Sequence, residues 1–151
     1  MWWVMTEEYK AMIRLLETDI KGDLPAVEGI SRIRGVGPSV ARAILHNLGI
    51  PLNKRIGFMT DDEIKRIEEA IKDIANIVPP YMVNRRFDRY TGKDIHLIGA
   101  DLKFMVDRDI EYEKNINSWR GVRHKLGLKV RGQRTRTTGR RHKKLVVKRR
   151  R

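Results

Sequence analysis

Apolar residues recur three or four positions apart in several stretches of the chain, which is the spacing of one face of a helix. The first two such stretches follow one another closely. Residues 24–34 predict a short helix with Asp23 as its cap and Pro25 in its first turn. A second helix is expected to begin at Pro38 and to end at Gly49.

Gly35-Val36-Gly37 joins these two helices, so the unit is predicted to be a helix-hairpin-helix. Without Cβ atoms, Gly35 and Gly37 let a phosphate approach the backbone. Main-chain amides at the start of the second helix would point at that phosphate. A tight turn without a ligand is the alternative. The basic C-terminal end of the chain favours phosphate contact.

A capping box opens the third predicted helix, with Thr60 as the N-cap and Glu63 three residues later. The helix is expected to end before Pro79-Pro80. Charged residues fill its other positions and predict an ordinary solvated face. Its apolar positions are Ile64, Ile67, Ile71 and Ile74.

A fourth helix is predicted from Ala100 to Asn115, and its other faces are rich in Asp and Glu. Because this surface is acidic, we expect it to face a basic protein rather than RNA. The predicted apolar face consists of Leu102, Met105, Val106 and Ile110.

Ser118 is expected to cap a short fifth helix that runs from Trp119 to Leu126 and stops at Gly127. The helical spacing of its apolar residues favours Trp119 as a core residue that attaches the basic segment to the domain, rather than as a stacking platform. The cations on its other face would be offered to a ligand.

Two further segments carry weaker patterns. Residues 9–20 fit a helix or a strand, and the turn signal Lys21-Gly22-Asp23 favours a short β-hairpin. Arginines alternate with aromatic residues in residues 79–93, and such aromatics can stack on bases. Phe87 pinning this loop to the domain is an equal alternative.

The positive charge of the chain is concentrated at one end. Fifteen of the 33 Lys and Arg residues, and none of the 19 Asp and Glu residues, lie in residues 117–151. Residues 1–116 are therefore close to neutral. We expect a globular helical domain in residues 1–128 and an extended basic tail in residues 129–151 that binds a polyanion, most simply a nucleic acid. A solvated tail or a localisation signal is the less favoured reading.

Composition excludes several functional classes. The chain has no cysteine, which excludes disulfides and thiolate metal sites. We expect a cytoplasmic protein, because no apolar run approaches the roughly 20 residues of a membrane span and the N-terminus does not resemble a signal peptide. The four histidines are scattered, and no catalytic motif is present. We therefore predict no metal, no cofactor and no enzymatic activity.

The segment from Trp119 to Leu128 (WRGVRHKLGL), followed by VRGQRT from Val130, resembles the family of ribosomal protein thirteen of the small subunit. The sequence TGKDIHLIG from Thr91 to Gly99 looks like the archaeal and eukaryotic branch of that family. The resemblance extends from about Met12 to His142, although Lys129 stands where many members have proline.

This resemblance implies a structural protein of the small-subunit head that binds ribosomal RNA, lies next to another head protein and contributes to inter-subunit bridges. The far tail from Arg140 would lie nearest the peptidyl-site tRNA. Together with the charge pattern, it predicts RNA contacts at Gly35, Gly37, Arg120, Arg123, His124, Lys125, Lys129, Arg131, Gln133, Arg134, Thr135, Arg136, Arg140, Arg141, Lys143 and Lys144.

Two other functions are alternatives to this one. A DNA glycosylase with a helix-hairpin-helix commonly needs an N-terminal proline nucleophile and a cysteine zinc finger, whereas this chain has Trp2 and no cysteine. A sequence-indifferent DNA-compacting protein would bind duplex DNA and ribosomal RNA equally well.

Overall fold

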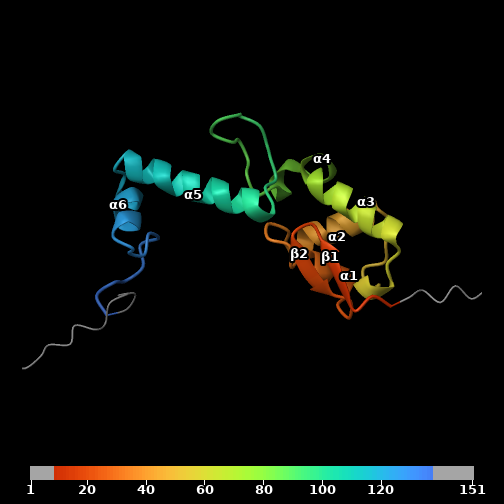
Figure 1. The fold of residues 1–151 in the computed structure, drawn as a ribbon. Coiled ribbons are helices and arrows are strands. Elements are labelled where there is room, and N and C mark those ends of the chain that lie inside the picture. The colour runs from red at the N-terminus through yellow and green to blue at the C-terminus, as the bar shows by residue number, and fades with distance from the viewer. Residues whose placement is uncertain (1–8, 138–151) are drawn as a thin grey trace, which may run out of the picture. The chain divides into compact units, whose positions relative to one another are not determined.

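The structure is a computed structural model that describes residues 9–137 (Figure 1). It contains two compact units, one ending at Leu102 and the other beginning at Lys103. Residues 9–137 are mostly helical, with one two-stranded antiparallel hairpin at the N-terminal end of this range. The expected helical class with an N-terminal hairpin is therefore confirmed.

Strands β1 (Met12–Leu15) and β2 (Thr18–Lys21) form the hairpin, in a register that pairs Ile13 with Ile20. Alternate side chains of a strand point to opposite faces. Ile13, Leu15 and Ile20 are consequently buried, while their neighbours are exposed or half-buried. The preference for a hairpin over a helix was correct.

Helices α1 (Ala26–Ile30) and α2 (Pro38–Asn47) form the helical pair. The stop of α2 is confirmed, because Gly49 has a φ of 68° and Ile50 N–H donates to the Leu45 oxygen. The start of α1 was predicted wrongly. Pro25 is the N-cap and makes no side-chain cap bond, whereas the Asp23 carboxylate accepts a hydrogen bond from the Tyr9 hydroxyl.

The first helix is also shorter than predicted. After Ile30 the hydrogen bonds tighten to the i→i+3 pattern, with Arg32 N–H donating to the Gly29 oxygen and Ile33 N–H to the Ile30 oxygen. This tighter turn leads into Gly35, whose φ of 99° no helix accommodates.

A 3₁₀ turn, η1 (Ile56–Phe58), precedes helix α3 (Asp61–Lys72). The predicted capping box is confirmed: Thr60 and Glu63 each accept from the main-chain N–H of the other. The predicted third helix is interrupted at Asp73. Asp73 has a φ of −109° and a ψ of 31°, which separates α3 from the short helix α4 (Ile74–Ile77).

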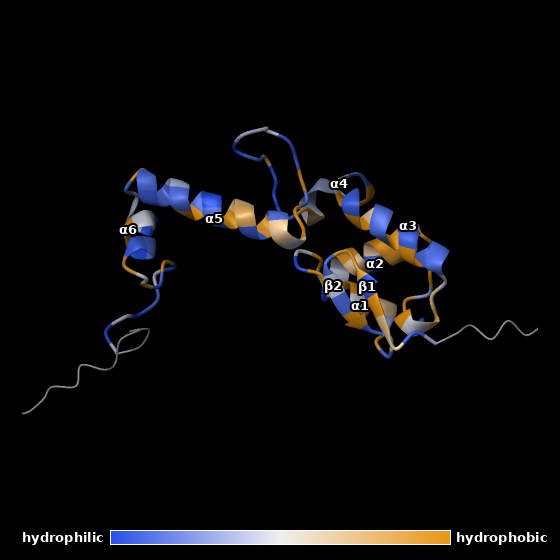
Figure 2. Cartoon of the chain, in the orientation of Figure 1, coloured by the Kyte–Doolittle hydropathy of each residue, from blue (hydrophilic) through white to orange (hydrophobic). Residues whose placement is uncertain are grey.

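The hydrophobic core of the first unit lies among the hairpin and helices α1 to α4. Figure 2 shows hydrophobic positions concentrated in these elements, whereas α6 and the segment after it are mainly hydrophilic. The largest fully buried side chains are Leu15, Ile20, Ile30, Ile44, Leu45, Ile56, Ile67, Ile71 and Ile74.

After a second 3₁₀ turn, η2 (Pro80–Met82), and a long loop, the chain forms α5 (Gly99–Asn115) and α6 (Trp119–Lys125). Their existence and extent agree with the sequence patterns. The burial expected for their apolar faces is not observed, because no residue of α5 is buried and Trp119 is 74% exposed. Trp119 is therefore not a core residue that attaches this segment to a domain.

Candidate nucleic-acid interface

Helix α6 holds the first cations of the predicted interface. Ser118 caps it by accepting a hydrogen bond from Gly121 N–H at 3.0 Å, and the same hydroxyl contacts the Glu113 carboxylate. At the other end, Leu128 N–H donates to the Arg123 oxygen, and Gly127 has a φ of 66°. The helix is therefore fixed at both ends.

A pocket of about 570 Å³ lies against α6 and the segment that follows it. Arg120 and His124 line it from successive turns of the helix, and Val130 and Arg131 line it from the segment. Two guanidinium groups and an imidazole around one hollow suit a phosphate group and the ribose or base attached to it.

Two residues that are predicted to contact RNA, Arg123 and Lys125, also form hydrogen bonds within this unit. The Nε of Arg123 donates to the Lys129 carbonyl oxygen at 3.0 Å, and its guanidinium lies 5.6 Å from the centre of the Trp119 ring. The Nζ of Lys125 donates to the Asn117 side-chain oxygen at 2.6 Å. Arg123 therefore ties the segment after α6 back to the helix.

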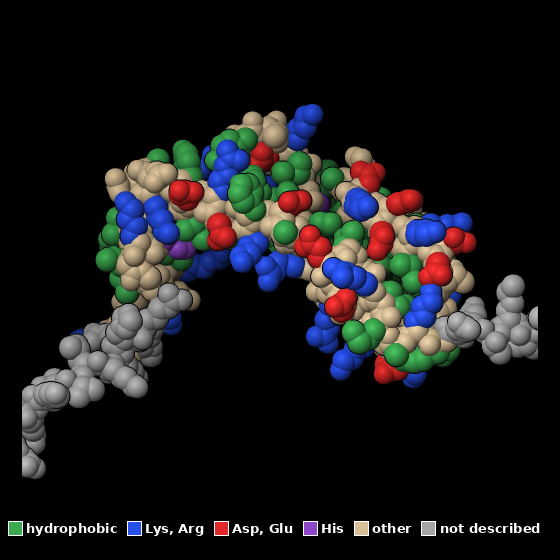
Figure 3. Space-filling view, viewed as in Figure 1, with side chains coloured by type: hydrophobic (Ala, Val, Ile, Leu, Met, Phe, Trp, Pro, Cys, Tyr) green, Lys and Arg blue, Asp and Glu red, His purple; other side chains and the backbone are tan. Residues whose placement is uncertain are grey.

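Residues 129–137 contain no helix or strand, and all of their Arg and Lys side chains are exposed. Gln133 is exposed, and Thr135 is half-buried. Figure 3 shows Lys and Arg side chains over α6 and a histidine beside them. Of the predicted contacts, Arg140, Arg141, Lys143 and Lys144 lie outside the described residues.

The Gly-Val-Gly turn belongs to the first unit. A Cβ on Gly35 would lie 2.5 Å from the Leu97 carbonyl oxygen, so the missing side chain of Gly35 serves the packing of the 84–98 segment. A Cβ on Gly37 would meet nothing within 4 Å, and Gly37 has a φ of −90°. Of the two glycines, Gly37 is the one with open space for a ligand.

His96 attaches the same segment to this turn. Its Nδ1 accepts from Asn84 N–H at 3.3 Å, and its Nε2 lies 3.0 Å from the Gly35 carbonyl oxygen. Nε2 therefore carries the proton of the neutral ring. Burial lowers the pKa of His96, and the bond to Gly35 opposes this shift.

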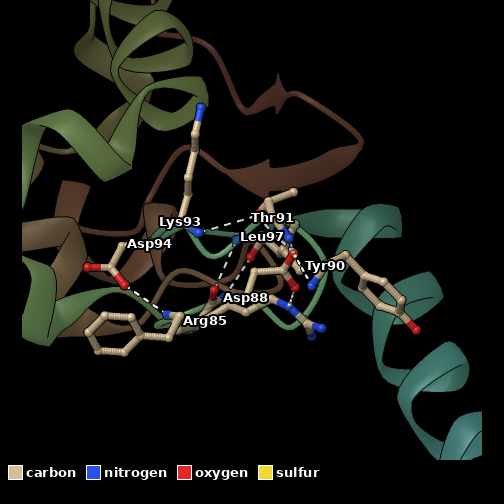
Figure 4. Close-up of polar contacts among 9 residues, drawn as sticks. Arg85, Asp88, Tyr90, Thr91, Lys93, Asp94 and Leu97 are labelled. Atoms are coloured by element: carbon tan, nitrogen blue, oxygen red, sulfur yellow. Dashed lines mark hydrogen bonds and ion pairs between the residues drawn. The ribbon is translucent and has the colours of Figure 1, made fainter.

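Asp88 organises the 84–98 loop (Figure 4). The sequence patterns described above did not predict this role. The side chain of Asp88 is buried and accepts from Arg85 Nε at 2.5 Å and from both the main-chain N–H and the hydroxyl of Thr91 at 2.9 Å. Together these bonds, that of Arg85 foremost, lower the pKa of Asp88 to about 2. The spacing Asp88-x-x-Thr91-Gly92, which is typical of an Asx turn, is the signal that could have found it.

The structure also tests whether Phe87 pins the loop to the domain. Its ring is 72% exposed, so Phe87 does not pin the loop to the domain. Backbone pairing between Arg85 and Ile95 and the bonds of Asn84 to the Leu97 main chain close the loop on itself. The contact of His96 with the Gly35 carbonyl oxygen attaches the loop to the rest of the unit.

Within residues 9–137, no group of three or more metal-ligating side chains is present. In the same part of the chain, no helix is both long and apolar enough to cross a membrane.

The chain matches the ribosomal protein S13/S18 family over residues 14–141. It is 56% identical to the small ribosomal subunit protein uS13 of Hyperthermus butylicus over 135 residues, which is 89% of each chain. It is 56% identical to uS13 of Staphylothermus marinus over 87% of this chain and 88% of that protein. With uS13 of Methanothermobacter thermautotrophicus it shares 44% identity over 96% and 98% of the two chains.

Proposed function

The chain belongs to the ribosomal protein S13/S18 family, and on that premise we propose that it is a structural constituent of the small ribosomal subunit that binds ribosomal RNA through α6 and the basic segment after it. The family is one of ribosomal structural proteins, so the protein acts by binding and not by catalysis. The observation that carries the proposal is the clustering of Arg120, His124 and Arg131 around one pocket, in a region without acidic residues beyond residue 116.

The mechanism is neutralisation of phosphates combined with recognition of RNA shape. Arginine binds phosphate oxygens in a bidentate manner and stacks on bases, and neutralised phosphates release their counterions. Because Arg123 fixes the Lys129 carbonyl, the segment from Lys129 onward leaves α6 in a set direction. The RNA would then contact the first cations of the tail together with those of α6.

The location of the protein within the ribosome is proposed from its family. The protein would lie in the subunit head, contribute to inter-subunit bridges and approach the peptidyl-site tRNA with the tail from Arg140. The tail would begin near residue 129, after the last hydrogen bond that closes α6. The RNA contacts predicted from the sequence, including those of Gly35 and Gly37, are proposed on the same basis.

Helix α5 suits a protein neighbour in the head. Its exposed apolar residues include Phe104, Val106 and Tyr112, and Asp and Glu residues lie between them. Such a surface would repel RNA phosphates and would attract a basic protein.

The salt dependence of binding to small-subunit ribosomal RNA tests this function. If about eight cations meet phosphates, log K against log salt should have a slope of about −6 to −7. Neutralising Arg120, Arg131 and Arg136 together to Gln should make that slope shallower by about 2 to 3.

The matched control replaces Lys65, Arg66 and Lys72, three exposed cations of α3, with Gln. The same charge is removed, yet the slope should stay unchanged. Equal effects of the two triple variants, or a wild-type slope near zero, would contradict the proposal. Equal affinity for duplex DNA would favour the DNA-compacting alternative.

A further inference from the structure

The tip of the 84–98 loop presents an exposed aromatic ring in an unusual backbone conformation. Phe87 is 72% exposed and has a φ of 48°, in the left-handed region that a bulky side chain rarely adopts. Among the described residues, Phe87 is not part of the hydrophobic core of the first unit. A strained conformation that is held in place without serving the core points to a binding role.

The loop around Phe87 is held firmly. Phe87 N–H donates to the Asp94 side-chain oxygen at 2.9 Å, and Asp88 N–H donates to the Lys93 carbonyl oxygen at 3.0 Å (Figure 4). Arg85 and Ile95 pair through both main-chain bonds. The backbone that carries the ring is thus already fixed, so binding would lose little conformational entropy of the loop.

The surface of this tip is positive. The charge of Asp88 is buried and neutralised by Arg85, while Arg86, Arg89 and Lys93 have exposed side chains. The guanidinium of Arg86 lies 5.4 Å from the centre of the Phe87 ring. An apolar protein partner would have to desolvate these cations, whereas a polyanion would gain from them.

From this arrangement we propose that Phe87 stacks on an unpaired base of RNA while Arg86 contacts the adjoining phosphate. An aromatic face beside a guanidinium is the combination with which proteins hold single-stranded bases. Base-paired RNA offers no such face, so the partner is a looped-out or bulged nucleotide. The proposal rests on the ribosomal RNA binding proposed above, but it uses other residues than α6.

The test uses the full chain with small-subunit ribosomal RNA. Phe87→Ala should weaken binding roughly 5- to 150-fold, the range for losing one stacked base. Because no phosphate contact is lost, the slope of log K against log salt should not change. Phe87→Trp should restore the affinity. Chemical probing of base accessibility should show one unpaired nucleotide protected by wild type and by Phe87→Trp, and exposed with Phe87→Ala.

Phe104→Ala is the matched control, because Phe104 is a similarly exposed phenylalanine, at 65%, on the acidic helix α5. It should leave both affinity and footprint unchanged. If Phe87→Ala behaves like Phe104→Ala while the wild-type salt slope stays steep, the stacking proposal is overturned and the function proposed for α6 stands. A flat wild-type slope would instead contradict the function of α6.

Discussion

A Cβ atom placed on Gly121 would lie 1.9 Å from the main-chain oxygen of Glu113 and 2.9 Å from the Cα of Lys114. Helix α6 therefore packs backbone against backbone on the last turn of α5, and Gly121 is the buried residue of that contact. The orientation of the cations on α6 depends on a position where no side chain fits.

We predict that Gly121→Ala destabilises the α5–α6 pair by about 1–3 kcal/mol, the usual cost of overpacking. Hydrogen exchange of the α6 amides measures the effect. Gly37→Ala is the control, since a Cβ there meets nothing within 4 Å and the φ of −90° suits alanine. Equal protection of α6 in the two variants would contradict the close contact.

Trp119 should contribute little to the stability of the free protein. Its side chain is 74% exposed, and its contact in the structure is with the guanidinium of Arg123. Trp119→Ala should change the free energy of unfolding by less than about 0.5 kcal/mol. Ile44→Ala, at a fully buried position, should cost about 2–5 kcal/mol. Urea unfolding of both variants provides the comparison, and similar losses would show that Trp119 is a core residue after all.

The parts of the fold that depend on neighbouring residues were predictable. The capping box of Thr60 and Glu63 and the serine cap of α6 use side chains within three residues of the groups they satisfy. The stop of α2 at Gly49 needs only a positive φ. In each case one short segment contains both the signal and its partner.

Several other features depend on distant residues, which no local pattern can show. The spacing of Trp119 predicts a helix face but cannot show whether another element covers it. At Gly35 there is no room for a side chain, because the carbonyl oxygen of Leu97, 62 positions later, lies too close. Charge segregation located the candidate interface, yet the pocket also needs Val130, an apolar residue that no charge pattern indicates.

His96 should make the stability of the first unit depend on pH. Burial lowers its pKa in the folded state below the ordinary value of 6.5. As pH falls through that ordinary value, the unfolded chain takes up a proton that the folded protein does not, so stability is lost on the acid side. The urea midpoint should therefore decrease between about pH 7 and pH 5. His96→Gln, which cannot titrate there, should flatten this part of the profile; an unchanged slope would assign the effect to another group.

Asp88 predicts a second pH effect at lower pH. The folded-state pKa of about 2 lies below the ordinary value of 3.8, so the stability that the ionised carboxylate contributes is present above the ordinary value and is lost as pH falls toward the folded one. Asp88→Asn removes the charge at every pH. Wild type and variant should differ most above pH 4 and converge as pH approaches 2.

Amide exchange of Thr91 is the local readout, because its N–H donates directly to the Asp88 carboxylate. At pH 5 the protection of Thr91 should be clearly lower in Asp88→Asn than in wild type, since Arg85 then lacks its charged partner in a buried site. The core amide of Ile44 should exchange equally slowly in both proteins at that pH, which separates loop opening from global unfolding. A Thr91 amide that is equally protected in both proteins at pH 5 would mean that the main-chain pairing of Arg85 with Ile95 holds the loop without Asp88.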